Sequence, residues 1–236
     1  MLMTTEGAAV PSRSWQTAIA LRRMALLQPH LPHYLLAPEV AVLLSYIHDE
    51  RQRMLFATLW NTGARITEAL TLTPEDIELD GPRPCLRLRT LKQRNRGRGR
   101  PARDERIARV VPLLDDVFVR DLRRYLATFR PGRRQPLFAS SRKTAWSWLK
   151  QAEERARDAG MVFAVSPLSP KTLRHSYAMH LFLNHVPPKV VQTYMGHERY
   201  ESTEVYLKVF ALDVAPQLGI RFTLDAQEWA PELLNR

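Results

Sequence analysis

Apolar residues recur at helical intervals along most of this chain. Near the N-terminus this spacing predicts one helix over residues 13–27, and the proline-containing stretch that follows predicts a linker. A denser apolar stripe begins at Pro38, a residue suited to the first turn of a helix. We therefore expect an N-terminal helix and linker over residues 1–37 and one larger domain over residues 38–236.

Further stretches with helical spacing follow, and Gly or Pro residues mark several of their ends. No internal repeat is visible. The predicted helices cover residues 51–61, 65–70, 117–126, 145–160, 170–184, 190–196 and 203–210.

The middle of the chain changes to a period of two. In CLRLRTL, leucines alternate with Arg87 and Arg89, which predicts a strand with one basic face, and RIARVVPL is its expected antiparallel partner. The single cysteine, Cys85, has no partner for an intrachain disulfide and is expected to be half-buried in the first strand. The predicted fold class is mostly α with a small antiparallel β-sheet (α+β).

Positive charge is concentrated in this strand region. The formal net charge is +11, and residues 83–109 alone contain eleven Lys or Arg against two acids. Such an excess favours a polyanionic partner. Nucleic acid fits better than a membrane, because no apolar run approaches the roughly 20 residues that a spanning helix needs. The N-terminus lacks the order of a signal peptide, so we expect a cytoplasmic location and no membrane partner.

Between the two strands lies the Gly- and Arg-rich segment QRNRGRGRPARDE. One interpretation is a solubilising loop, and the other is a basic hairpin that becomes ordered on phosphates. The second is favoured because both flanks are strand-like. The expected DNA-binding residues are Arg87, Arg89, Arg94, Arg96, Arg98, Arg100 and Arg103.

The last third of the chain carries residues suited to phosphoryl transfer. A phosphodiester can be cut without a metal or other cofactor if a side-chain oxygen attacks phosphorus and cations stabilise the transition state. Tyr206 is a candidate nucleophile, and Arg65 and Arg174 can offer bidentate donors to the phosphate oxygens. Each has a plainer explanation when taken alone, such as a surface charge or one of seven tyrosines.

Three ordered boxes resemble the signature of the tyrosine recombinase (phage integrase) family. The first is GARITEALTL, with Gly63, Arg65, Glu68 and Leu72. The second is LSPKTLRHSYAMHLF, which contains Arg174, and the third is MGHERYESTEVY, in which the tyrosine follows His197 by nine residues. The resemblance covers residues 38–210 and implies the catalytic-domain fold of that family.

By this resemblance, Arg65 and Arg174 clamp the scissile phosphate and Tyr206 forms a 3'-phosphotyrosyl link. His197 binds a nonbridging oxygen or holds the pocket, and Glu68 orients the basic residues. A general-acid lysine is expected in the hairpin between the strands, where Lys92 is the only lysine. Its ammonium donates a proton more readily than a guanidinium does.

Two features depart from the family pattern. Lys171 stands where the second box carries histidine; it acts as the proton acceptor for Tyr206 if its pKa is depressed, or else only as a charge. The 37 residues before the domain are fewer than a core-binding domain needs, which resembles compact plasmid resolvases and fimbrial invertases. A C-terminal packing segment, 207–236, is expected to dock in cis or on a neighbouring copy.

The resemblance implies a metal-independent, site-specific DNA strand transferase that resolves plasmid multimers or inverts or integrates a segment. Its expected partners are double-stranded DNA and other copies of the chain, as a dimer or tetramer on DNA, with no small-molecule substrate. Two alternatives remain open. One is an enzyme similar to type IB topoisomerases or telomere resolvases, and the other is a DNA-binding regulator that keeps the fold without cleaving.

Overall fold

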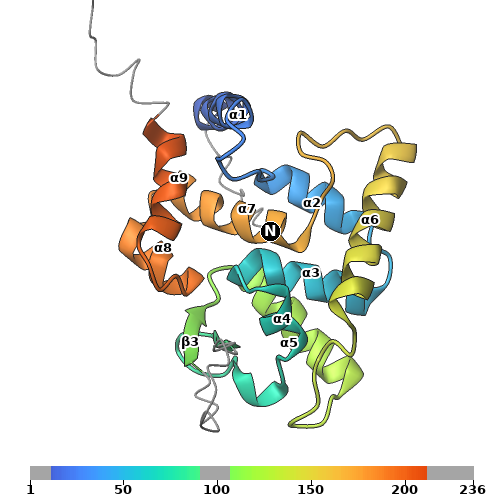
Figure 1. Ribbon diagram of the computed structural model, residues 1–236. Helices are drawn as coiled ribbons and strands as arrows, with labels where there is room; N and C mark the ends of the chain where they lie inside the picture. The colour runs from blue at the N-terminus through green and yellow to red at the C-terminus, as the bar shows by residue number, and fades with distance from the viewer. Residues whose placement is uncertain (1–11, 91–106, 212–236) are drawn as a thin grey trace, which may run out of the picture.

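Helices make up most of the structure, as the apolar spacing predicts. The computed structural model describes residues 12–90 and 107–211 of the chain (Figure 1). The helices are α1 Ser12–Leu26, α2 Ala37–Ser45, α3 Glu50–Thr62, α4 Ile66–Leu70, the 3-10 helix η1 Pro74–Asp76, α5 Asp116–Phe129, α6 Arg142–Asp158, α7 Pro170–Leu183, α8 Pro188–Met195 and α9 Glu201–Ala211. The strands are β1 Ile77–Glu78, β2 Cys85–Thr90 and β3 Ile107–Pro112.

The three strands form one antiparallel sheet in the order β1-β2-β3. The antiparallel pairing of β2 with β3 confirms the predicted strand pair. Strand β1 was not predicted, because its two residues are too few to show an alternating pattern. Leu86 and Leu88 are fully buried, and Arg87 is exposed on the opposite face. Cys85 is half-buried, as predicted. The fold class is therefore the expected α+β.

Helix α7 runs through the middle of the molecule. In Figure 1 it lies between α6 on one side and α8 with α9 on the other, and α3 packs directly against it. Ser169 caps its start by accepting a hydrogen bond from the Thr172 backbone at 3.1 Å, and Pro170 occupies its first turn. This cap sets the register in which α7 presents Arg174 and His175 to the residues around them.

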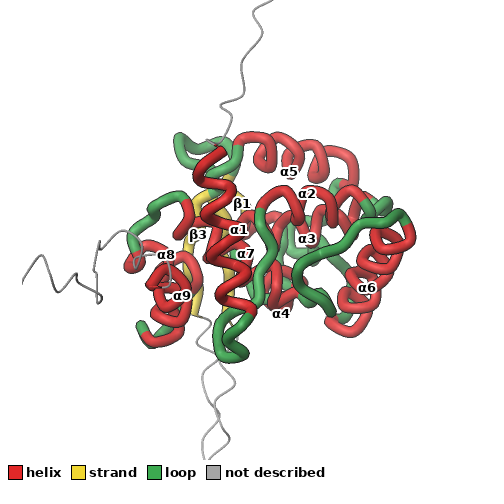
Figure 2. The backbone as a smooth tube through the Cα atoms, turned by 90° about the horizontal axis from the view of Figure 1, so that it is seen from above, coloured by secondary structure: helices red, strands yellow, loops and turns green. Residues whose placement is uncertain are grey.

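A second buried cluster joins the N-terminal helix to the end of the chain. Leu21 of α1 packs in the same cluster as Phe182 of α7, Met195 of α8 and Tyr206 of α9. Helix α1 contacts α9, and Figure 2, seen from above, shows α1 passing over α7. The segment after α1 is also buried at Leu31. The predicted boundary near residue 37 stays a prediction, although residues on both sides of it share one core.

Several predicted residues lie outside the described ranges. These are Lys92, Arg94, Arg96, Arg98, Arg100 and Arg103 of the basic segment and most of the C-terminal segment 207–236. Among the helices of residues 12–90 and 107–211, none is long and apolar enough to cross a membrane.

The packing of α1 predicts that this helix contributes to the stability of the whole unit. Leu21 is 1% exposed, so Leu21→Ala should lower the free energy of unfolding by about 2–5 kcal/mol, as for other buried leucines. Urea denaturation would measure the change. The control is Leu27→Ala, because Leu27 is 82% exposed and should cost little. Equal effects of the two changes would contradict the packing of α1 against the core.

Candidate active site

The C-terminal end of α8 gathers three arginines that are far apart in the sequence. Carbonyl oxygens at a helix end have no partner within the helix and carry partial negative charge, so they attract cations. Here each of three consecutive carbonyls accepts a hydrogen bond from a different guanidinium. The pairs are Arg109 Nε to Tyr194 at 2.8 Å, Arg174 Nη2 to Met195 at 2.6 Å and Arg65 Nη2 to Gly196 at 3.4 Å.

Glu68 holds two of these arginines through a buried carboxylate. Its side chain is 2% exposed, and Arg109 donates to both of its oxygens, Nη1 to Oε1 at 2.9 Å and Nη2 to Oε2 at 2.7 Å. Arg65 donates to the same carboxylate from Nη1 at 2.9 Å and from its backbone N–H at 2.8 Å. Glu68 of the short helix α4 thus ties Arg65, the residue that caps this helix, to Arg109 of strand β3.

Two glycines make these close approaches possible. Gly63 and Gly196 end α3 and α8 in the left-handed conformation, at φ 60° and 61°. A Cβ on Gly196 would lie 2.8 Å from Arg109 Cδ, and one on Gly63 would lie 2.3 Å from the ring of Tyr177. The Gly63 carbonyl also accepts a hydrogen bond from Arg174 Nη1.

Arg174 is the most deeply placed cation of the site. It is 8% exposed, and burial, followed by repulsion from Arg65 and Arg109, lowers its pKa to about 10. The guanidinium therefore keeps its charge at neutral pH. The two carbonyl bonds use two of its five N–H donors, which leaves donors for a further acceptor.

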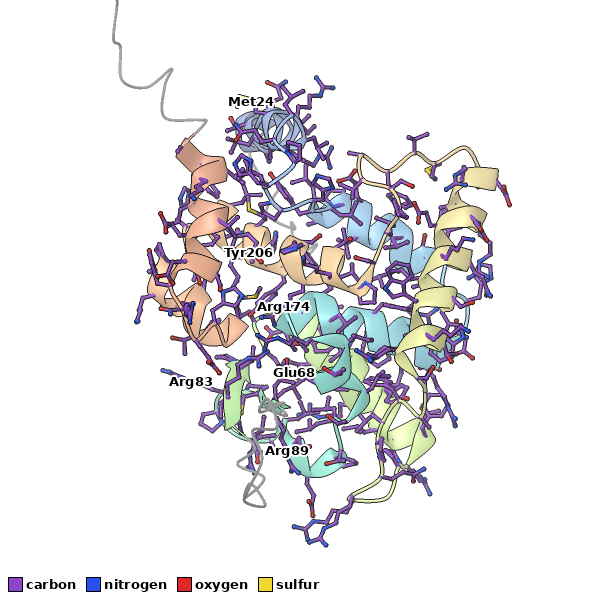
Figure 3. All side chains as sticks on the ribbon, viewed as in Figure 1. Met24, Glu68, Arg83, Arg89, Arg174 and Tyr206 are labelled. Carbon is purple, nitrogen blue, oxygen red and sulfur yellow. The ribbon has the colours of Figure 1, made fainter. Side chains whose placement is uncertain are left out.

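Tyr206 lies next to this cluster, on α9. Figure 3 shows Tyr206, Arg174 and Glu68 following one another down the middle of the molecule. The phenol is 2% exposed, and burial raises its pKa to about 12 against the opposing influence of Arg174. Its hydroxyl lies 2.7 Å from Nδ1 of His175. The phenol therefore stays protonated in the free protein at neutral pH.

His197 lies on the other side of the tyrosine. Its ring is nearly parallel to that of Tyr206, with an interplanar angle of 5° and centroids 6.3 Å apart, and its Nδ1 lies 2.8 Å from the Thr203 hydroxyl. Burial, and then repulsion from Arg174, Arg65 and Arg109, lowers its pKa to about 4. His197 is thus neutral at physiological pH.

An open pocket of about 650 Å³ faces the cluster from the solvent side. Its walls include Arg65, Arg109 and His197, together with Lys189 and Arg199 from α8 and the loop that follows it. The walls carry the cations Arg65, Arg109, Lys189 and Arg199 against one acid, Glu198, and Glu68 lies behind them. The cations outnumber the two carboxylates, so the pocket is electropositive and suits an anion such as a phosphate. Among residues 12–90 and 107–211, no group of three or more His, Cys, Asp or Glu side chains is placed to hold a metal ion.

The structure brings Arg65, Glu68, Arg174, His197 and Tyr206 together. Lys171 belongs to the first turn of α7, where its side chain is exposed, and within the described chain no hydrogen bond joins it to Tyr206. Of the predicted DNA-binding arginines, Arg87 is exposed on β2. Arg89 forms an ion pair of 2.5 Å with the buried Asp76, so its predicted role in DNA binding stays a prediction.

Arg109 and His175 have contacts at the site that the sequence did not predict. Arg109 was counted only as part of the basic run, but the register pairs it with Leu88. Cross-strand partners point to the same face, so Arg109 faces inward with the leucines. His175 follows Arg174 directly in the second box, and the box assigns it no role. One sequence feature does point to His175. It follows Lys171 by four residues, so the two side chains lie on the same side of a helix.

A buried tyrosine beside clustered arginines, on a helical fold with one small antiparallel sheet, defines the catalytic domain of a tyrosine-type DNA strand transferase. The chain belongs to the phage integrase family, whose model matches residues 33–212.

Individual relatives agree with this family. A probable site-specific recombinase in the afa region of Escherichia coli is 49% identical over 225 residues, which cover 95% of this chain and 89% of that protein. An Escherichia coli resolvase is 43% identical over 237 residues, with 94% and 91% covered.

Solved structures share the fold. The XerH site-specific recombinase in a post-cleavage complex with a palindromic difH substrate aligns with a TM-score of 0.61 at 21% identity. The alignment covers 80% of this chain and 53% of that one, so this chain spans about half the length of that recombinase.

Arg109→Lys keeps the positive charge but removes the two-pronged bond to Glu68. We expect DNA strand cleavage to fall by about 10-fold or more, because Glu68 and the α8 carbonyls then hold Arg65 less firmly. Single-turnover cleavage would measure the change. The control is Arg120→Lys, since Arg120 is exposed and pairs with Asp121. Unchanged cleavage by Arg109→Lys would show that Arg109 does not order the site.

The lowered pKa of His197 predicts a pH dependence of stability. The unfolded histidine has a pKa near 6.5, whereas the folded one is about 4, so between these values the unfolded state binds more protons. Stability should therefore fall as the pH drops from about 6.5 to about 4. His197→Gln should reduce the slope of unfolding free energy against pH by up to about 1.4 kcal/mol per unit in the middle of this range. Urea denaturation at several pH values would show this, and an unchanged slope would contradict the burial of a neutral imidazole.

Proposed function

We propose that this chain cuts and rejoins DNA at specific sites, with Tyr206 as the nucleophile. The phenolic oxygen attacks the scissile phosphorus and forms a 3'-phosphotyrosyl link, while the 5'-oxygen leaves and takes up a proton. The reverse attack by a 5'-hydroxyl rejoins a strand. The covalent link conserves the energy of the phosphodiester, so this chemistry requires no nucleotide or metal.

The observation that carries the proposal is the gathering of Arg65 and Arg174 at one helix end beside Tyr206. Both guanidinium groups have N–H donors beyond those used within the protein, and these donors suit the nonbridging oxygens of a phosphate. His197 lies on the wall of the same pocket, and its proposed role is to donate a further hydrogen bond to the phosphate. Lys92, which lies outside the described residues, keeps its proposed role as the acid that protonates the 5'-oxygen.

Tyr206 must be uncovered before it can attack. Its side chain is 2% exposed and it does not belong to the walls of the arginine pocket. The proposed reaction therefore includes a rearrangement on DNA binding that opens a path between the arginine pocket and the phenolic oxygen. This requirement prevents the free protein from cutting DNA at random.

The proposed partners are double-stranded DNA and further copies of the chain assembled on it. The relatives named as resolvases and recombinases support a role in resolution, inversion or integration. We propose a cytoplasmic location, where such DNA is found. The basic segment around residues 91–106 is proposed to bind DNA phosphates without reading the base sequence.

The test is a denaturing-gel assay for a covalent protein–DNA adduct, with EDTA present. The substrate is supercoiled DNA that carries the sequences flanking the gene. The wild type should form an adduct, and Tyr206→Phe should form none because it lacks the attacking oxygen. Tyr200→Phe is the matched control, since Tyr200 is 43% exposed at the start of α9 and should cleave normally.

Two results would count against the proposal. An adduct that survives Tyr206→Phe would assign the nucleophile to another residue. Tight binding without any adduct in the wild type would favour the alternative of a DNA-binding regulator that keeps the fold without cleaving.

A further inference from the structure

His175 is the side chain that contacts the hydroxyl of the candidate nucleophile. Its Nδ1 lies 2.7 Å from the Tyr206 oxygen, which is the separation of a good hydrogen bond and within reach for proton transfer. The two rings are tilted by 58° with centroids 5.6 Å apart, so the imidazole meets the phenol through its edge. The contact joins α7 to α9, across 31 positions of sequence.

The other groups near the phenol are poorly suited to accept its proton. Arg174 is a permanent cation at neutral pH and has no acceptor atom. His197 faces the phenol with its ring plane and directs Nδ1 to the Thr203 hydroxyl at 2.8 Å. Lys171 has an exposed side chain, and no hydrogen bond joins it to Tyr206 in the described residues. Of these four residues, only His175 has a ring nitrogen that can accept a proton at hydrogen-bond distance from the Tyr206 hydroxyl.

The imidazole of His175 is neutral in the free protein. Burial lowers its pKa to about 4, and Lys171, Arg174 and His33 act in the same direction. A neutral imidazole has one nitrogen that accepts and one that donates. If the phenol donates to Nδ1, the ring proton resides on Nε2.

We propose that Nδ1 of His175 accepts the proton of Tyr206 as the phenolic oxygen attacks the DNA phosphate, in the position of proton acceptor that Lys171 leaves unfilled. This role rests on the proposed function of Tyr206. It assigns the proton transfer to a residue one helical turn beyond Lys171, on the same side of α7.

The step balances without any additional reactant. The O–H bond of Tyr206 breaks and an N–H bond forms at Nδ1, so His175 becomes an imidazolium. The phenolic oxygen bonds to phosphorus, the bond from phosphorus to the 5'-oxygen breaks, and that oxygen takes a proton from Lys92 or from water. When a 5'-hydroxyl attacks the phosphotyrosyl link, its proton goes to Lys92 or to water and its oxygen bonds to phosphorus. The bond from phosphorus to the phenolic oxygen breaks, and the imidazolium returns its proton to that oxygen.

DNA itself strengthens this base. In the free protein the phenol is a weak acid and the imidazole a weak base, so the proton stays on Tyr206. Two of the influences that weaken the imidazole are the positive charges of Lys171 and Arg174. A phosphate bound at the arginine cluster offsets part of this charge, and the imidazole then holds a proton more readily. Lys171 thus acts as a charge beside the base.

The first test needs no DNA. Nitrogen-15 NMR of the free protein at neutral pH reports which ring nitrogen of His175 carries the proton. We expect Nε2 to be protonated and Nδ1 to be unprotonated, and Tyr206→Phe should shift the Nδ1 signal because the hydrogen bond is lost. A proton on Nδ1 would overturn the proposal, because this nitrogen could then accept nothing from the phenol.

The second test measures cleavage with the adduct assay. Asparagine can still bond to the phenol but cannot take its proton, so His175→Asn should cleave at least about 100-fold more slowly than the wild type. Added imidazole should restore part of the activity of His175→Ala, which a purely structural histidine would not show. The control is His180→Asn, because His180 lies on the same helix and packs on Trp60 instead of Tyr206.

The outcomes separate this role from the proposed function. If the wild type forms an adduct that Tyr206→Phe abolishes, while His175→Asn cleaves within about threefold of the wild type, the nucleophile stands and His175 is not the proton acceptor. A larger loss in Lys171→Gln than in His175→Asn would return the role to Lys171. If the wild type forms no adduct at all, the proposed function fails and this role fails with it.

Discussion

Three guanidinium groups lie close together in this protein, and their mutual repulsion has to be offset for the fold to hold them. Two features offset it. The first is the buried carboxylate of Glu68, which binds Arg65 and Arg109. The second is the C-terminal end of α8, whose last carbonyls bind Arg65, Arg109 and Arg174 in turn. Breaking a buried ion pair by removing one partner is costly, because the other charge stays behind without compensation. The positions of α4, β3, α7 and α8 relative to one another all depend on this arrangement.

The same arrangement accounts for the proposed chemistry. The cations around the pocket outnumber the carboxylates of Glu68 and Glu198, so a positive charge remains that a DNA phosphate can offset. The arginines are already oriented before DNA arrives, so little reorganisation is needed when charge develops in the transition state. Tyr206, in contrast to the arginines, is not ready to react in the free protein. It is buried, protonated and hydrogen-bonded to a neutral histidine, and the reaction depends on DNA to uncover it.

Much of the fold and of the candidate site could be predicted from the sequence, because both depend largely on local residue patterns. Helical spacing located the helices to within a few residues, and the alternation around Leu86 and Leu88 located the hairpin. The three sequence boxes predicted that Arg65, Arg174, His197 and Tyr206 share one site. Arg109 was missed because its inward direction depends on the register of β2 with β3, which is set by pairing across a long connection. The role of His175 was missed because it depends on how α9 packs against α7. The sequence spacing shows only that His175 and Lys171 share a helix face.

The most direct test of the arginine cluster is a crystal structure of the Tyr206→Phe variant bound to a DNA duplex that contains the cleavage site. We expect the scissile phosphate to lie within about 3 Å of donors on Arg65 and Arg174. Arg109 should remain bound to Glu68, and the α8 carbonyls should keep their arginine partners. A phosphate bound away from this cluster, or arginines that leave Glu68 and α8 to reach it, would contradict the account.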